Sequence, residues 1–215
     1  MTKFINLHTH QFSNLSDVME VVNQYPWEFD ASIPSYSIGI HPWYIDENRL
    51  ETDLKIIKQK LQLDECLALG ECGLDKRIEI PLDLQISVFK QQLEIVKQTK
   101  KPIVLHCVAA YDEVIAIKKE MKITNPMIIH GFSKNEQVAQ SLLKNGFYLS
   151  FGKYLLRNPD LEKVFTFAPE NQILLETDTI EESIYQVYEK AAAIKGISVE
   201  EMKTIVFTNF STIFS

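Results

Sequence analysis

Short apolar runs alternate with longer amphipathic segments along most of the chain, and this alternation restricts the possible folds more than any other feature. The runs cover residues 4–7, 36–40, 66–70, 103–105, 127–129, 147–150 and 173–175. Runs this short and this apolar are typical of strands buried on both faces, as in a parallel sheet. We therefore expect a sheet whose strands are joined by helices.

The segments between the runs show the period of helices. One amphipathic pattern extends from Leu50 to Leu61, and another begins near Pro81 and continues to Val96. Capping boxes, with a serine three residues before a glutamate, predict two more helix starts, at Ser133 with Glu136 and at Ser198 with Glu201. Strand–helix alternation predicts an α/β fold. Six or more such units favour a (β/α) barrel, with an open doubly wound sheet as the alternative.

The segment after the first run breaks this pattern. Only Gln11–Asp17 separate His10 from the strand-like run Val18–Val22, and a parallel crossover usually needs about a dozen residues. We expect this run to be an antiparallel strand or to lie outside the barrel. At 215 residues the chain is shorter than the ~250 of a typical barrel. The prediction is a distorted TIM (β/α) barrel with a truncated first strand–helix unit, forming one domain over residues 1–215.

Charge and cysteine content narrow the possible environments and partners. The formal net charge of −7 argues against non-specific coating of duplex DNA, which needs a broad basic surface, but permits a small basic pocket. Three cysteines without a Cys-x-x-Cys motif do not make a disulfide framework. Because there is neither a signal peptide nor a membrane-length apolar run, we expect a cytoplasmic protein without a membrane partner.

Every histidine lies at or just past the carboxyl end of an apolar run, and two acids are placed in the same way. These residues are His8, His10, His41, His106 and His130, with Glu71 and Asp178. In a parallel barrel such positions converge on one rim, where active sites form. A single histidine at a strand end is more often a hydrogen-bonded loop residue than a ligand. The joint pattern favours a metal site.

The ligand count predicts two metal ions. His8 and His10 are two residues apart in an extended segment and point to one side. With His106, His130, Glu71 and Asp178 they supply more donors than one tetrahedral zinc needs. They suit two ions about 3.5–4 Å apart, of zinc, manganese or magnesium, with Glu71 as the bridge. A metal-activated water would be the nucleophile, and Asp178 would both bind metal and accept its proton.

The motifs resemble those of the TatD-type metal-dependent hydrolases, a family that includes deoxyribonucleases, from about Phe4 to Phe214. The matching segments are 7–10, 39–43, 69–75, 102–106, 129–133, 146–152 and 174–178. The resemblance implies a distorted TIM barrel. It implies one ion held by His8, His10 and Asp178, a second held by His106 and His130, and Glu71 between them. His41 would face the substrate.

Four positions depart from the family pattern: Asn6 replaces an acid, Val108 an arginine, Lys134 a glycine and Ile180 a proline. Loss of the arginine removes a partner that could bind phosphate with two hydrogen bonds. Cations near other strand ends could replace it, or could be ordinary solvated surface residues: Lys76, Arg77, Lys134, Lys153 and Arg157. Trp43 and Tyr44 could stack on a base, but packing over the shortened first unit is the preferred interpretation.

The favoured function is hydrolysis of an ester bond, most plausibly a phosphodiester of single-stranded or frayed DNA, at a binuclear metal site. The main alternative keeps the same ligands but cleaves a small phosphoester, a lactone or an amide. A third hypothesis is a non-catalytic metal-binding module that contacts a partner. It ranks last because no expected ligand is missing. The sequence leaves the oligomeric state open.

Overall fold

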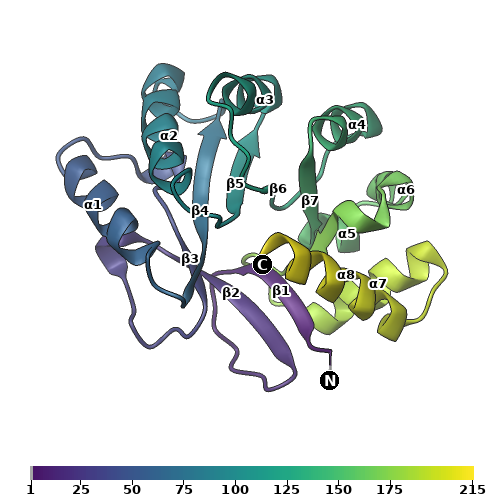
Figure 1. The fold of residues 1–215 in the computed structure, drawn as a ribbon. Helices are drawn as coiled ribbons and strands as arrows, with labels where there is room; N and C mark the ends of the chain where they lie inside the picture. Colours follow the sequence, from purple (N-terminus) through teal and green to yellow (C-terminus); the bar gives the residue numbers. More distant parts are fainter. Residues whose placement is uncertain (1) are drawn as a thin grey trace. The chain divides into compact units, whose positions relative to one another are not determined.

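The structure is a computed structural model that describes residues 2–215, in which eight strands are hydrogen-bonded in chain order (Figure 1). They are β1 (Phe4–Thr9), β2 (Val18–Gln24), β3 (Tyr36–Ile38), β4 (Cys66–Asp75), β5 (Ile103–Val108), β6 (Met127–Ile129), β7 (Phe147–Phe151) and β8 (Ile173–Leu175). The pairs β1–β2, β3–β4, β4–β5 and β7–β8 are parallel. This order confirms the (β/α) barrel class, because a doubly wound sheet would reverse its strand order at a switch point.

Helices follow most strands. They are α1 (Leu50–Lys60), α2 (Leu82–Val96), α3 (Tyr111–Glu120), α4 (Glu136–Lys144), α5 (Lys153–Arg157), α6 (Asp160–Phe167), α7 (Ile184–Lys195) and α8 (Val199–Ile213), with short 3-10 turns at η1 (Pro26–Glu28), η2 (Pro42–Tyr44) and η3 (Glu170–Gln172). No α-helix lies between β1 and β3 in this structure, so the truncated first unit is confirmed. Within residues 2–215, none of the helices has the length and apolarity needed to cross a bilayer.

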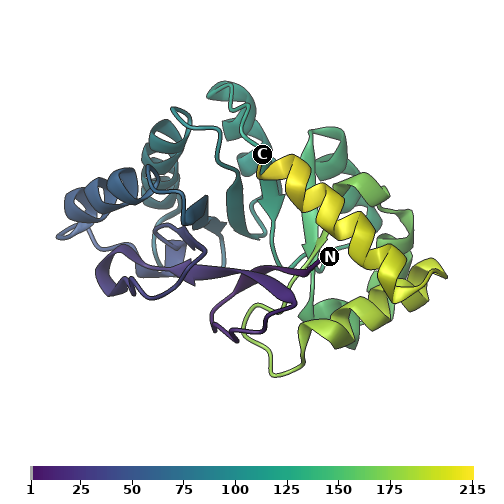
Figure 2. The same ribbon diagram turned by 60° about the horizontal axis from the view of Figure 1, so that its bottom comes forward.

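The described residues divide into two compact units. The central unit is Asn23–Ile128, and the terminal unit combines the residues up to Val22 with Ile129–Ser215. In the terminal unit α8 lies against α7, β1 and β8 (Figure 2). In the central unit α2 packs against β4 and α1. The single domain over residues 1–215 stays a prediction.

The strand β2 corrects one expectation. It is parallel to β1, with Phe4 opposite Val18 and Ile5 opposite Met19. The return path from Thr9 to Val18 has to cover about the length of β1, roughly 17 Å. The intervening residues 10–17 can span about 26 Å when extended, so the connection needs no helix. A minimum of about a dozen residues applies to helical crossovers, and this crossover is an irregular strap with bends and a turn but no helix.

Helix ends confirm one capping box and correct the other. The Ser198 side chain accepts a hydrogen bond from the Glu201 backbone N–H, and Glu201 bonds back to Ser198, so that box is present. At α4 the cap is Asn135, whose side chain accepts from Val138 N at 3.1 Å. Ser133 is therefore not the cap, because α4 begins two residues later than the predicted capping box would place it.

Two buried glutamines of α2 hold the backbone where β3 and β4 end. Gln92 accepts from Ile40 N at 2.7 Å and donates to Ile40 O at 3.2 Å. Gln85 accepts from Asp75 N at 2.8 Å and donates to Asp75 O at 3.0 Å. These glutamines lie seven positions apart and point to the same face of the helix. They fix the backbone next to His41 and at Asp75.

The terminal unit fixes its strand ends by the same means. The Tyr188 hydroxyl, from α7, accepts from Ile5 N at 3.0 Å and donates to Ile5 O at 3.1 Å. The amide of Asn6 accepts from Thr177 N and donates to Thr177 Oγ1, both at 2.9 Å. Asn6, which replaces the usual acid of the family motif, thus joins β1 to the segment after β8. Asn6 lies two residues before His8 in β1, so this link fixes the strand close to His8.

Candidate metal centre

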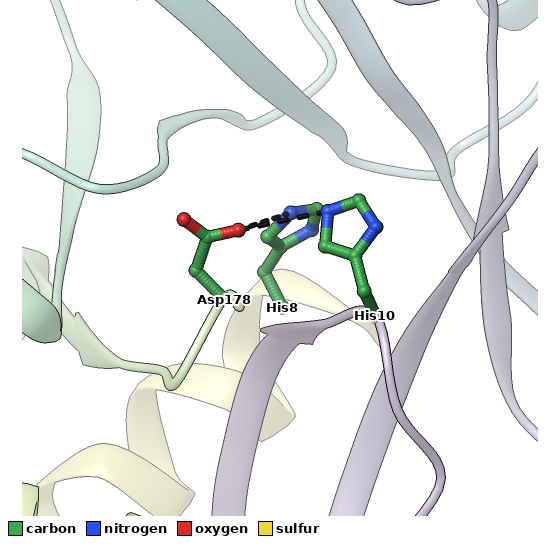
Figure 3. A group of neighbouring side chains, drawn as sticks. All are labelled: His8, His10 and Asp178. Atoms are coloured by element: carbon green, nitrogen blue, oxygen red, sulfur yellow. Dashed lines mark ion pairs between the residues drawn. The ribbon is translucent and has the colours of Figure 1, made fainter. Parts of the chain in front are cut away.

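The terminal unit brings His8, His10 and Asp178 together (Figure 3). The distances from Asp178 Oδ1 are 3.8 Å to His8 Nε2 and 3.6 Å to His10 Nε2. Their backbones are also joined, because Asp178 N donates to His8 O at 2.9 Å and His10 N donates to Asp178 O at 3.2 Å. The main chain therefore holds the three side chains side by side.

Local backbone irregularities direct these side chains. Between Asn6 and Thr9, β1 has one residue more than β2 has between Glu20 and Val22. This bulge falls beside His8 and changes the direction of its side chain. Asp178 has a φ of 56°, the left-handed conformation that aspartate tolerates better than most residues. It forms a parallel bridge with Thr9.

A divalent ion fits this cluster, which we call the terminal cluster. Ligand atoms about 2.1 Å from a tetrahedral zinc lie about 3.4 Å from one another. The observed separations of 3.6 and 3.8 Å are close to that value and longer than a good hydrogen bond. Two imidazoles and a carboxylate are the donors that zinc and similar transition metals prefer.

His130 lies in the same unit, with its ring 4.4 Å from the ring of His8. Its Nδ1 is 3.3 Å from Glu176 Oε1, which also accepts from Gly131 N at 2.7 Å. Burial alone would raise the pKa of the Glu176 carboxyl, but the interactions with His130, His8 and Ser150 together outweigh burial and lower it. A carboxylate behind an imidazole fixes the ring and its tautomer, as it does behind metal-bound histidines.

The central unit holds a second group around Glu71, which we call the central cluster. Glu71 Oε1 is 3.1 Å from His41 Nε2 and 2.9 Å from His106 Nδ1. A register shift between Leu69 and Cys72 places a bulge of β4 at Glu71. The Glu71 N–H donates to Asn23 Oδ1 at 2.7 Å. These contacts bury Glu71 and His41 almost completely.

The glycine at position 73 lets β4 and β5 approach closely beside this cluster. A Cβ atom at Gly73 would lie 2.0 Å from the carbonyl oxygen of His106, and the φ of 140° is one that other residues rarely adopt. Any side chain there would push β5 away. The contact between Glu71 and His106 depends on this approach.

Asp75 lies behind His106 as Glu176 lies behind His130. Its Oδ2 is 3.3 Å from His106 Nε2 and accepts the Trp43 indole N–H at 2.7 Å, while Oδ1 accepts from Arg77 N at 2.8 Å. Burial would raise the pKa of the Asp75 carboxyl, but these hydrogen bonds together lower it. Trp43 is half exposed, and its indole N–H holds Asp75. Tyr44 packs against Tyr25 and Trp27 of the shortened first unit, with ring centres 5.4 and 6.0 Å apart.

The His41 tautomer follows from its contacts. The Nδ1 atom accepts the backbone N–H of Trp43 at 3.1 Å, so a neutral ring carries its proton on Nε2. That proton faces Glu71. His41 therefore donates to Glu71, and of the central cluster Glu71 and His106 are the better candidates to hold an ion. The ligand atoms of all three lie within 4.8 Å of one another.

The predicted cations differ in their surroundings. Lys76 forms an ion pair with Glu113 at 2.5 Å, and Arg77 contributes its backbone N–H to Asp75. Lys134 is half-buried between β6 and α4. Lys153 and Arg157, at the two ends of α5, line one open cavity of about 420 Å³. Only this last pair shares a described cavity.

Sequence reasoning missed Asp75 and Glu176. Both stand inside the motifs, four residues after Glu71 and two before Asp178. Nothing in one sequence distinguishes an acid that holds a histidine from one that faces solvent. Their burial at 2% and 0% exposure would have been the necessary signal.

Comparisons with known proteins agree with the motifs. A family model described as TatD related DNase matches residues 1–215. The uncharacterized metal-dependent hydrolase YabD of Bacillus subtilis is 30% identical, over 93% of this chain and 82% of its own length. The 3'-5' ssDNA/RNA exonuclease TatD of Erwinia billingiae is 30% identical over 65% of this chain and 55% of its own. The crystal structure of the TatD homologue YJJV from Escherichia coli has the same fold, with a TM-score of 0.84, 20% identity and coverage of 99% and 98% of the two chains.

Proposed function

The chain is a metal-dependent hydrolase of the TatD-related DNase family, and we propose that it cleaves phosphodiester bonds of single-stranded or frayed DNA with two divalent ions. The observation that carries this proposal is the terminal cluster, in which His8, His10 and Asp178 have the donors and the spacing for an ion. When bound, zinc, manganese or magnesium would activate a water molecule and stabilise charge on the phosphate.

Asp178 has two roles in this proposal. Its Oδ1 faces both imidazoles and would hold the ion (Figure 3). Its other carboxylate oxygen points away from both rings in the same view and would accept the proton of the attacking water. Asp178 also lines a cavity of about 160 Å³, so a substrate can approach it.

The central cluster would hold the second ion through Glu71 and His106. A neutral His106 has one ring proton and can donate to only one of its two carboxylate neighbours. An ion between Nδ1 and Glu71 would leave Nε2 to donate to Asp75, which satisfies both contacts. Glu71 as a bridging carboxylate, and the joint use of His106 and His130, stay predictions.

The choice of DNA rests on two supports. A relative with 30% identity is named as an ssDNA/RNA exonuclease. Lys153 and Arg157 also offer positive charge along one cavity of the terminal unit. The competing function, hydrolysis of a small ester, is favoured by Val108 and by the ion pair that occupies Lys76.

The test compares substrate classes with the metal-loaded protein. Labelled single-stranded DNA, bis(p-nitrophenyl) phosphate, a lactone panel and an acyl ester panel are each incubated with zinc, manganese or magnesium. We expect cleavage of the phosphodiesters and its loss in Asp178→Asn. Cleavage of lactones or acyl esters alone would replace the proposal with the small-ester function. Metal binding without any hydrolysis would support the non-catalytic hypothesis.

A further inference from the structure

Two cavities of the terminal unit are lined by residues of the segment 177–183, which follows β8. The inner cavity, of about 160 Å³, is lined by Asp178 and by residues of β1, of the strap after it and of the start of α7. The outer cavity, of about 420 Å³, is lined by Lys153, Arg157 and the same segment. Ile180 and Glu182 line both. A ligand that extends from Asp178 past these two residues would enter the outer cavity.

The chemistry of the two cavities differs. Leu15, Ile180, Ile184 and Tyr185 give the inner cavity an apolar wall. Its other lining residues are polar or acidic, including Glu20 and Asp178, and none of those described is lysine or arginine. Such a wall suits a sugar or a base better than a phosphate. The outer cavity is lined by two cations from one short helix, Lys153 and Arg157, and by two acids, Glu181 and Glu182. A phosphate is the anion that a guanidinium and an ammonium bind together.

In this structure the guanidinium of Arg157 forms an ion pair with the carboxylate of Glu182. Arg157 Nη2 is 2.6 Å from Oε1 and 2.9 Å from Oε2 of that carboxylate, and Nε is 3.2 Å from Oε1. The side chains of Arg157 and Glu182 are 52% and 30% exposed. An ion pair this exposed contributes little to stability, so its exchange for another anion costs little. A phosphate offers the guanidinium the same paired oxygens.

We propose that the outer cavity binds the phosphate adjacent to the scissile one, and that Glu182 holds the Arg157 guanidinium in place until this phosphate replaces it. The inner cavity then holds the nucleoside between the two phosphates. The proposal rests on the proposed function, because it takes the bond cleaved beside Asp178 to be a phosphodiester. In this proposal Arg157 supplies a phosphate-binding guanidinium, which the family motif has at the position of Val108 in this chain.

A purely structural role for the ion pair makes a different prediction. If Arg157 and Glu182 only fix the segment that carries Asp178, removal of either side chain should impair the protein in the same direction. If Glu182 competes with phosphate for Arg157, the two substitutions act in opposite directions. Glu182→Gln should then tighten binding, and Arg157→Gln should weaken it. The sign of the two effects separates the roles.

The experiment measures binding and cleavage in parallel. Fluorescence anisotropy of a fluorescein-labelled oligothymidylate, with and without added zinc, is followed for wild type, Arg157→Gln, Glu182→Gln and Lys90→Gln. Lys90 is the matched control, an exposed cation bound to both oxygens of Glu120 at 2.7 and 2.9 Å in the central unit. We expect Arg157→Gln to weaken binding about tenfold and to reduce the slope of log K against log salt by about 0.7. Lys90→Gln should match wild type.

Initial rates with thymidine dinucleotide and trinucleotide complete the test. Arg157→Gln should raise the KM for the trinucleotide, which has a second phosphate, more than that for the dinucleotide. Effects of the same sign for Arg157→Gln and Glu182→Gln, or no binding by the wild type, would overturn the inference. Absence of cleavage together with opposite signs in binding would overturn only the proposed function.

Discussion

The terminal and the central unit each bring histidines and carboxylates together, but the atoms of the two clusters lie at different distances. In the terminal cluster Asp178 Oδ1 is 3.6–3.8 Å from two imidazole nitrogens. In the central cluster Glu71 Oε1 is 2.9–3.1 Å from its two. The first spacing is that of ligands around an ion, whereas the second is that of hydrogen bonds. We call the terminal cluster open and the central cluster closed, because Glu71 lies within hydrogen-bond distance of both imidazoles of the central cluster.

The difference has a structural cause. Backbone hydrogen bonds join His8, His10 and Asp178 in the terminal cluster and hold their side chains 3.6–3.8 Å apart. The central cluster is fixed by side chains, because Asp75 and Trp43 hold His106 while a backbone N–H holds His41. An ion entering the central cluster must replace the contact between Glu71 and His106. We expect the terminal cluster to bind its ion more tightly.

The largest effect should come from Asp178→Asn. The amide keeps the shape of the side chain but is a poorer ligand and cannot accept the proton of the attacking water. We expect a loss of about 10²–10⁴ in kcat/KM for bis(p-nitrophenyl) phosphate. Calorimetric titration with zinc should show that the tighter binding event disappears while the weaker one remains. Loss of the weaker event instead would reverse our ranking of the two clusters.

Glu47→Gln provides the control for charge removal, because Glu47 lies in an exposed loop of the central unit. It should leave both binding events and the rate unchanged. Circular dichroism of Asp178→Asn should match wild type, which separates loss of a ligand from loss of the fold. If Asp178→Asn is unfolded, zinc titration of Glu71→Gln can rank the two clusters instead. In that variant we expect the weaker binding event to disappear and the tighter one to remain.

Removal of metal should have the next largest effect. An ion present at about 100 times its Kd stabilises the folded state by about 2.7 kcal/mol. For a chain of this size that corresponds to a fall in Tm of about 5–11 °C on chelation, restored by zinc or manganese. Following the Tm during stepwise metal addition compares the two clusters. We expect binding at the terminal cluster, the tighter site, to account for most of the rise in Tm. A Tm unaffected by chelator and metal would contradict both sites.

Substitution of the carboxylates that contact His106 and His130 should have the third largest effect on metal binding and activity. Asp75→Asn and Glu176→Gln each remove the charge that orients an imidazole, and such changes typically cost 10–100-fold in metal affinity or activity. Asp75→Asn should weaken the second binding event, because His106 belongs to the central cluster. Metal titration and kcat/KM of the two variants measure this. Equal weakening of both events by Asp75→Asn would show that the clusters are not independent.

The sequence predicted the residues of both clusters better than their geometry. Apolar runs placed the strands, and the histidine and acid positions after them identified His8, His10 and Asp178. The structure brings these three side chains together, as strand ends and ligand types, which are local properties of a chain, indicated, and their role as ligands stays a prediction. The local pattern did not predict that β2 is parallel to β1. The direction of β2 depends on the path of residues 10–17 rather than on their composition.

The roles of Asp75 and Trp43 were beyond the sequence for a related reason. Which nitrogen of a histidine binds metal depends on the group that contacts the other nitrogen, and that group comes from elsewhere in the chain. Trp43 is 32 positions from Asp75, and only the fold brings its indole to that carboxylate. The difference between an open and a closed cluster has the same origin.

The smallest effect should come from Trp43→Phe, which keeps an aromatic ring but removes the N–H that bonds to Asp75. That hydrogen bond is one of those that lower the pKa of the Asp75 carboxyl in the folded state. A carboxyl with a lowered folded pKa stabilises the protein above its unfolded pKa of about 3.9, and this stabilisation is lost as the pH falls through the folded pKa. Without the N–H the folded pKa rises toward the unfolded value, so less stabilisation remains to be lost.

Wild type and Trp43→Phe should therefore have similar free energies of unfolding at the lowest pH and should diverge as the pH rises from about 3 to 5, by about 1 kcal/mol. Urea unfolding with a chelator present measures this difference without the metal. Trp27→Phe is the control, because Trp27 packs under the guanidinium of Arg49, 3.9 Å from its ring centre. The effect of Trp27→Phe on the free energy of unfolding should not vary between about pH 3 and 5. A difference between wild type and Trp43→Phe that is constant with pH would mean that the indole only packs against the cluster. The closed geometry of the central cluster would then depend on Asp75 and His106 alone.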